Sequence, residues 1–277
     1  MAIQINTNSS SLGVQKTLST ANRGMANSIK KLSSGLRINS SSDDAAGLAV
    51  AEGLKAQTRG FSQAMSNATQ GVAMLQTADS AQQTISDTLV RMRELAVQSA
   101  SDSVTDTERA YINTEFTSLA GEIDRISNAT EYNGQKLLDG TAGTAGTLTF
   151  QVGTRNTSDD RITIAMGDSD STALAINSSA VDTLTNAQSA IDAIDAAIDT
   201  LNTDRATVGA TMNQLGKAID NLGSTVENLS VAEGNIRDVD VASESANFSK
   251  SQVVQQAGVA MLSQANASPN FALRLLS

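Results

Sequence analysis

The sequence predicts a mainly α fold, in which long antiparallel helices from both chain ends form a coiled-coil-like rod with a small β-hairpin region at 147–167. Three observations support this fold class. The 277 residues include one Pro, which permits long uninterrupted helices. Five Phe, two Tyr and no Trp leave little aromatic bulk for a thick globular core. Near the C-terminal end, apolar residues recur at alternating spacings of three and four.

The heptad run covers residues 191–236. Its seam contains Ile191, Ile194, Ile198, Leu201, Val208, Met212, Leu215, Ile219, Leu222, Val226, Leu229 and Ile236. One helix over this range would be roughly 69 Å long, so it needs partners along its whole length.

Arg205 and Glu233 interrupt the seam. They could form a polar pair that sets the register, or Arg205 could pass the seam edge to reach solvent; we expect the second.

The N-terminal half predicts three helices. The first covers residues 3–36, with apolar positions at spacings of mostly three, four or seven, and ends in a polar linker. Asp43 and Asp44 precede a second helix that fades near Ser99. We interpret these carboxylates as helix caps rather than metal ligands. After a polar turn, a third helix carries an apolar stripe over residues 112–126.

The period changes beyond residue 140. Apolar residues alternate over 148–152 and again over 162–166, which predicts a β-hairpin with a longish loop at 154–160. A polar stretch at 168–179 leads to the heptad helix. A last amphipathic segment runs over residues 248–262, and we expect Pro269 to terminate it.

Composition excludes several function classes. The chain has no Cys and no His, which removes thiolate chemistry, the usual general base and the commonest metal ligand. We therefore expect no enzyme, no cofactor and no metal site. No stretch approaches the 18 or so apolar residues of a membrane-spanning helix, and no Sec-type signal peptide is visible.

Charge is unevenly distributed. Residues 1–42 hold five cations and no acid, whereas residues 182–244 hold eleven acids and three cations. A nucleic-acid arm is one interpretation of the basic N-terminal segment. Because its cations are spread out and lack interleaved aromatic residues, we expect a solvated polar face and no nucleic-acid partner.

The first and last predicted helices carry apolar side chains that we expect their own chain to leave uncovered. Burying one Leu or Ile fully is worth about 1.5–3 kcal/mol, so several exposed positions per subunit can drive polymerisation. The predicted polymerisation stripes contain Ile5, Leu12, Leu18, Met25, Ile29, Leu32, Val254, Met261 and Leu262.

Collinear segments resemble the bacterial flagellin family. In the family's order they are 32–40 (LSSGLRINS), 43–49 (DDAAGLA), 91–100 (RMRELAVQSA), 122–127 (EIDRIS), 132–140 (YNGQKLLDG), 255–258 (QQAG) and 264–266 (QAN). The resemblance covers roughly residues 1–140 and 181–277. It implies a structural subunit of the flagellar filament that polymerises into a helical tube used for swimming motility.

The resemblance also implies an organisation and a set of partners. Residues 1–44 with 236–277 would form an inner terminal-helix domain, the core of the tube. Residues 45–235 would form a rod-like helical domain with the β-hairpin, and about forty residues between the signature halves leave no room for a large outer domain. The subunit would be secreted through the flagellum's own type III apparatus. Its expected partners are further copies of itself, an export chaperone, and the filament cap and junction proteins.

Three residues match positions that contact Toll-like receptor 5 in flagellins recognised by this innate immune sensor. They are Arg91, Leu95 and Glu115. The two charged side chains could form charge-assisted hydrogen bonds around an apolar Leu95, a plausible hot-spot pattern. The same residues could instead join neighbouring subunits in the filament, and both uses are compatible.

Two other functions stay open at this point. A hook–filament junction protein shares the terminal helices and the export route, but the full set of segments, especially the C-terminal ones, argues against it. A secreted coiled-coil adhesin or binding module would keep the heptads, yet has no reason to carry matched segments at both ends.

Overall fold

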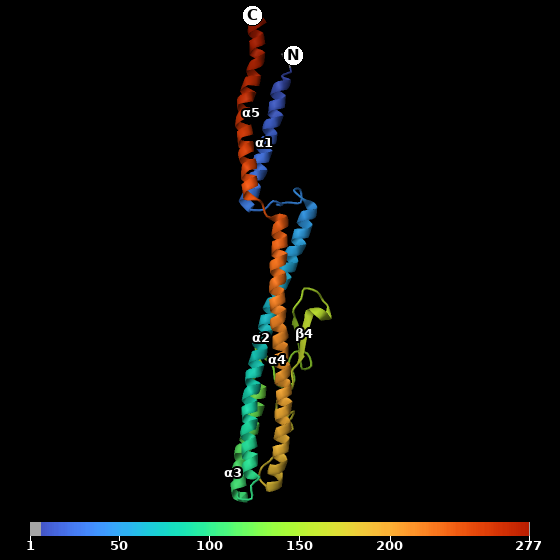
Figure 1. Ribbon diagram of the computed structural model, residues 1–277, viewed down its shortest axis with the longest axis vertical. Helices are drawn as coiled ribbons and strands as arrows, with labels where there is room; N and C mark the ends of the chain where they lie inside the picture. The colour runs from blue at the N-terminus through green and yellow to red at the C-terminus, as the bar shows by residue number, and fades with distance from the viewer. Residues whose placement is uncertain (1–6, 277) are drawn as a thin grey trace. The chain divides into compact units, whose positions relative to one another are not determined.

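The structure is a computed structural model that describes residues 7–276, with side chains for residues 7–267. Its helices are α1 (Ser9–Ser34), α2 (Ala45–Ser99), α3 (Asp106–Ala129), α4 (Leu184–Arg237) and α5 (Val241–Leu276). Its strands are β1 (Glu131–Tyr132), β2 (Gln135–Lys136), β3 (Thr147–Gln151) and β4 (Arg161–Ala165), with a 3₁₀ turn at Ser158–Asp160 (Figure 1). The chain divides into two compact units, residues 1–56 with 228–277, and residues 57–227.

The predicted fold class is confirmed. The corrections concern where the first helix begins, which carboxylate caps the second helix and where the last helix ends. α1 begins at Ser9, where the Asn8 side chain accepts a hydrogen bond from the Ser11 N–H at 3.0 Å. Asp44 caps α2 by accepting from the Gly47 N–H at 2.9 Å, whereas Asp43 accepts from the Asn39 and Ser40 N–H groups and holds the preceding turn. The Asn39 hydrogen bond is the main reason that the pKa of Asp43 is lowered.

The prediction that Pro269 ends the last helix is wrong. The backbone of α5 stays helical to Leu276. Proline lacks its own N–H and crowds the carbonyl one turn earlier, which weakens a helix at one point. A helix that continues beyond that point bends there instead of ending.

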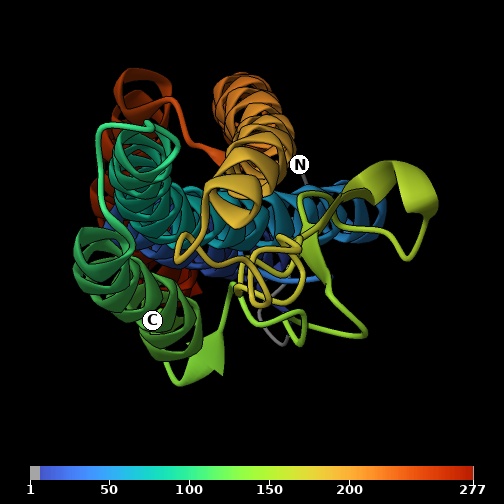
Figure 2. The same cartoon turned by 90° about the horizontal axis from the view of Figure 1, so that it is seen from below.

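The core of residues 57–227 is one apolar cluster shared by α2, α3, α4 and the β3–β4 hairpin. Its fully buried side chains include Leu75, Ile85, Leu89, Met92, Phe116, Ile123, Ile194, Leu201 and Leu215. Within this unit α2, α3 and α4 lie side by side (Figures 1 and 2). Buried positions on α4 run from Ala187 to Leu222, so the chain itself covers most of the heptad seam. Beyond Leu222 the seam residues are at most half-buried.

Three ion pairs connect α2 to α4, one of them between Arg237 Nη1 and Glu52 Oε1 at 3.0 Å. Arg93 Nε lies 2.6 Å from Asp195 Oδ1, and Arg205 Nε lies 3.0 Å from Asp79 Oδ1. The residue numbers rise on one helix as they fall on the other, so the helices are antiparallel. The Arg205 side chain is 26 % exposed and its guanidinium binds Asp79. The expectation that Arg205 passes the seam to reach solvent is therefore wrong, because α2 supplies a carboxylate beside the seam.

The predicted hairpin is confirmed, with Leu148 opposite Ile164 and Phe150 opposite Ile162. A second, shorter hairpin pairs β1 with β2. Its turn residues Asn133 and Gly134 have φ of 52° and 76°, the left-handed conformation that an Asn-Gly turn adopts readily.

The segment after β4 was predicted only as a polar connection. Ser169, Ser171, Leu174 and Ile176 are all buried in it. The Ser169 N–H donates to the Leu138 carbonyl at 2.9 Å. This segment therefore packs as part of the core, although its composition is polar.

Glycines of α2 let the β3–β4 hairpin approach the helix. A methyl group at Gly71 would lie 2.8 Å from the nearest ring atom of Phe150, and one at Gly60 would lie 2.7 Å from Thr154. Eleven residues separate the two glycines, about three helical turns, so both lie on one face of α2. Glycine lowers the stability of a helix, and at these two positions the close packing of the hairpin against α2 offsets that loss.

We predict that Gly71→Ala destabilises residues 57–227 by about 1–3 kcal/mol, because the Phe150 ring cannot move away without losing its own contacts. The matched control is Gly121→Ala in α3, where an added methyl meets nothing within 4 Å. The control should stabilise the protein by up to about 1 kcal/mol through helix propensity. Urea unfolding followed by circular dichroism measures both. Equal stabilisation by the two variants would contradict this account of hairpin docking.

Candidate functional site

The terminal helices α1 and α5 pair through polar side chains. Asn8 Nδ2 donates to the Ala265 carbonyl at 2.9 Å, and Ser11 Oγ donates to Asn266 Oδ1 at 2.9 Å. At the other end of the pair, Ser28 Oγ donates to Glu244 Oε1 at 2.5 Å. The helices are therefore antiparallel, and the described chain ends lie together at one end of the pair (Figure 1). These bonds fix the register of α1 against α5.

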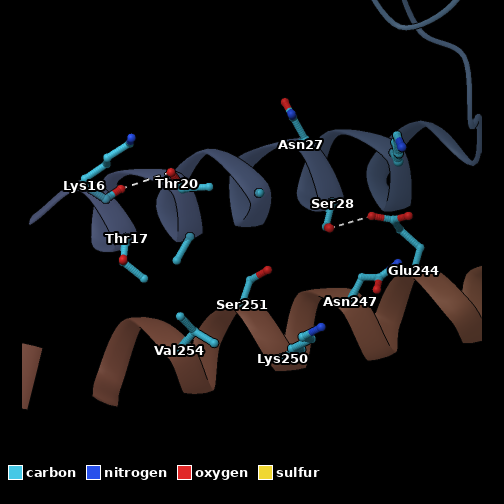
Figure 3. A pocket seen from close by; sticks show the side chains of 13 residues that line it. Lys16, Thr17, Thr20, Asn27, Ser28, Glu244, Asn247, Lys250, Ser251 and Val254 are labelled. Carbon is cyan, nitrogen blue, oxygen red and sulfur yellow. Dashed lines mark hydrogen bonds between the residues drawn. The ribbon is translucent and has the colours of Figure 1, made fainter. Parts of the chain in front are cut away.

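A polar groove runs between α1 and α5. In Figure 3, Thr17 and Ser28 on α1 point toward α5, where Ser28 meets Glu244. Ser251 and Val254 point back toward α1, whereas the side chains of Lys16 and Asn27 point away from α5. Its volume is about 640 Å³, and the Ser28–Glu244 hydrogen bond crosses it. A neighbouring groove of about 410 Å³ is more apolar and includes Val14, Val254, Ala257 and Met261. The two helices pack closely, because a methyl group at Gly24 would lie 3.4 Å from Ser251 and one at Gly258 would lie 3.4 Å from Leu18, and the grooves run along the surface of the pair.

The structure separates the predicted polymerisation stripes into two groups. Half-buried members are Leu18, Met25, Leu32, Val254 and Leu262. Leu12, Ile29 and Met261 are exposed, Leu12 at 59 % and Met261 at 58 %. Ile5 lies outside the described residues. Val253 and Val259 are also exposed, and the sequence analysis omitted them although they flank Val254 and Met261 on α5.

The second candidate site lies where α2 meets α3. Arg91 Nε and Nη2 donate to Glu115 Oε1 at 3.1 and 2.9 Å, and Nη1 donates to Glu94 Oε2 at 2.9 Å. These side chains are about half exposed. The hydrogen bond to Glu115, followed by that to Glu94, raises the pKa of Arg91. The arginine therefore lies between two carboxylates in a fixed position on the surface.

Leu95 does not join this surface. It is 2 % exposed and belongs to the apolar core with Leu89 and Met92. The expectation that Leu95 offers an apolar centre between the charges needs correction, because this position faces the interior of the helical unit. The exposed apolar side chains on this part of α2 are Val90 (47 %) and Val97 (49 %), which line a shallow cleft of about 390 Å³ with Arg93, Glu94 and Gln98.

Among residues 7–276, no group of three or more acidic, His or Cys side chains is placed to hold a metal ion. No helix in the same part of the chain is long and apolar enough to cross a membrane.

Comparison with known proteins identifies the family. The bacterial flagellin N-terminal helical region matches residues 5–143, and the bacterial flagellin C-terminal helical region matches residues 191–276. The chain belongs to the bacterial flagellin family.

Individual relatives agree. A flagellin of Halalkalibacterium halodurans is 41 % identical over 248 residues, which cover 90 % of each chain. The crystal structure of Bacillus cereus flagellin is 31 % identical, with a TM-score of 0.50, over 61 % of this chain and 94 % of the other. A putative flagellar hook-associated protein from Vibrio parahaemolyticus has a TM-score of 0.58 over 71 % of this chain and all of the other, but at 17 % identity it shows the fold alone.

This flagellin is a structural subunit of the bacterial flagellar filament and not an enzyme. It self-assembles into the filament that serves motility. Such a subunit needs surfaces that bind copies of itself, and the exposed apolar side chains of α1 and α5 are candidates for them.

We predict that substitutions of Leu95 and Arg91, two neighbours on α2, differ greatly in their effect on stability. Leu95→Ala should destabilise this flagellin by about 2–5 kcal/mol, because it leaves a cavity in the core. Arg91→Ala should leave the unfolding midpoint nearly unchanged, because exposed ion pairs contribute little. Urea unfolding of both purified variants measures the difference. If Leu95→Ala proves as stable as the unaltered protein, the buried position of Leu95 is incorrect.

Proposed function

We propose that this flagellin polymerises through its terminal helices, with residues 1–44 and 236–277 forming the inner tube and residues 45–235 the surrounding rod. The observation that carries the proposal is the exposure of Leu12, Ile29 and Met261 on the α1–α5 pair, whose other described stripe residues are half-buried. Burying these side chains against other copies would stabilise the polymer, since apolar burial is the dominant favourable term in association. The compact unit of residues 1–56 and 228–277 contains both proposed tube segments.

Export and partner binding complete the proposal. The subunit would leave the cell unfolded through the flagellar type III apparatus, with a chaperone before export and the cap and junction proteins at the growing filament. The absence of Cys supports this route, because the unfolded chain cannot form disulfides on the way.

The test of assembly is seeded growth. We predict that Leu12→Ser combined with Met261→Ser slows elongation from filament fragments by at least about tenfold, because each substitution removes apolar area that assembly would bury. The matched control is Val231→Ser on α4, a side chain of similar exposure, 59 %, outside the proposed stripes. Light scattering and electron microscopy follow the growth.

Three outcomes would count against this assignment. Unchanged growth of the double variant would exclude these two residues from the contact. An equal slowing of elongation by Val231→Ser would show that the contact includes exposed apolar residues outside the predicted stripes. If the unaltered protein only caps the ends of fragments, it acts as a junction protein instead.

We also propose that the monomer is recognised by Toll-like receptor 5 through the Arg91–Glu115 pair. Both side chains are half exposed and held in place by their mutual hydrogen bonds, so little side-chain entropy is lost on binding. Glu94, which pairs with Arg91, also lines the cleft that holds the exposed Val90 and Val97, so we propose that these two side chains provide the apolar area that Leu95 does not. A surface of this kind also suits contact between subunits, so the receptor would compete with polymerisation.

We predict that Arg91→Ala weakens binding of the monomer to the receptor ectodomain by about tenfold or more, as expected for a hot-spot arginine. The matched control is Arg125→Ala, an exposed arginine on α3 that pairs with Glu122. Surface plasmon resonance on the monomeric fraction measures both affinities. If Arg91→Ala and the unaltered protein bind equally well, the pair is not the contact.

A further inference from the structure

A cleft of about 350 Å³ lies within residues 57–227, between α2, the turn of the β1–β2 hairpin and strand β3. None of its lining residues is charged, although 17 % of the chain is. A phosphate, a carboxylate or an amine would find no countercharge among these side chains, so the cleft offers no electrostatic attraction to a charged ligand. A ligand suited to this cleft is therefore uncharged.

Five carboxamides line the cleft. Those of Asn67 and Gln151 form hydrogen bonds within the protein, and the other three come from different places in the fold. Gln70 lies on α2, Asn133 in the β1–β2 turn and Gln135 on β2. Within the described part of the chain, none of these side-chain amides forms a hydrogen bond. Each amide offers one acceptor oxygen and two N–H donors. Groups that both donate and accept, as hydroxyls do, can pair with such amides in either direction.

Two aromatic side chains also line the cleft. Tyr132 and Phe150 are half-buried and pack against the core. Phe150 lies so close to Gly71 that an added methyl group there would be 2.8 Å from the ring, so its position is fixed. The electron-rich face of an aromatic ring attracts polarised C–H bonds, such as those on the apolar face of a sugar ring.

We propose that this cleft binds a neutral saccharide. The lack of charge, the unpaired amides and the aromatic side chains are three separate observations that favour one chemical class, a polyhydroxylated ring without a formal charge. This class is distinct from the apolar surfaces that assembly would bury.

The walls of the cleft are braced before any ligand binds. Asn67 Nδ2 donates to the Gln151 carbonyl at 3.3 Å, which connects α2 to β3. The Gln151 side chain donates to the carbonyls of Gly153 and Arg155 at 2.9 and 2.8 Å. A braced site loses less entropy when it binds, so weak individual contacts can add up to a measurable affinity.

The experiment uses the full-length monomer and four neutral disaccharides: cellobiose, maltose, lactose and N,N′-diacetylchitobiose. Saturation-transfer difference NMR at millimolar sugar identifies a binder, and glucuronate serves as an anionic comparison. We expect transfer to at least one neutral disaccharide and less transfer to glucuronate. Amide shifts in a labelled sample should be confined to residues 67–74, 132–136 and 149–151.

Substitutions then test the amides. Gln70→Ala combined with Gln135→Ala should weaken the binding of that disaccharide by about fivefold or more, because two hydrogen-bonding groups are lost. The control is Gln76→Ala, an exposed glutamine of α2 outside the cleft, which should bind as the unaltered protein does.

Any one of three results would overturn the proposal. The first is no transfer to any of the neutral sugars, and the second is undiminished binding by the double variant. The third is a set of cleft shifts that follows protein concentration instead of sugar concentration, because a second copy of the chain would then be the occupant. Assembly of filaments does not enter these measurements, so their failure would leave the proposed polymerisation untouched.

Discussion

A long helix has no interior of its own, and this constraint governs the whole molecule. Every apolar stripe must be covered by another helix, a strand or another subunit. Between Ala187 and Leu222, α4 is covered by its own chain, mostly by α2 and α3. The α1–α5 pair is different, because polar bonds hold it and Leu12, Ile29 and Met261 stay exposed. One part of the chain thus buries its apolar stripe within a single molecule, and the other leaves apolar side chains exposed.

Periodic patterns predicted most of the fold. The heptads of α4 and the alternation in β3 and β4 identify these elements because burial on one face requires a regular spacing of apolar residues. Elements without a periodic apolar pattern were missed. The β1–β2 hairpin carries an Asn133–Gly134 signal in the sequence, but it was used only as a family resemblance. The burial of Ser169 and Ser171 leaves no signal in composition, because their N–H groups donate to partners far along the chain, the Leu138 carbonyl and the Asp124 carboxylate.

At the candidate sites, the sequence identifies residues but not the directions or partners of their side chains. Resemblance assigns Arg91, Leu95 and Glu115 to a contact by position, and the first and third do meet on the surface. Resemblance does not give the direction of a side chain, and Leu95 faces the core. Similarly, the heptad identifies Arg205 as an interruption but not Asp79 as its partner, because that pairing depends on how α2 and α4 are aligned.

Pairing of α1 with α5 joins residues more than 250 positions apart, as in the Asn8–Ala265 and Ser11–Asn266 bonds. Contacts of such separation form slowly and demand that nearly the entire polypeptide be present. A partly delivered or truncated molecule lacks one helix of the pair, whichever terminus arrives first. The α1–α5 pair and the grooves along it therefore exist only in a chain that holds both terminal segments.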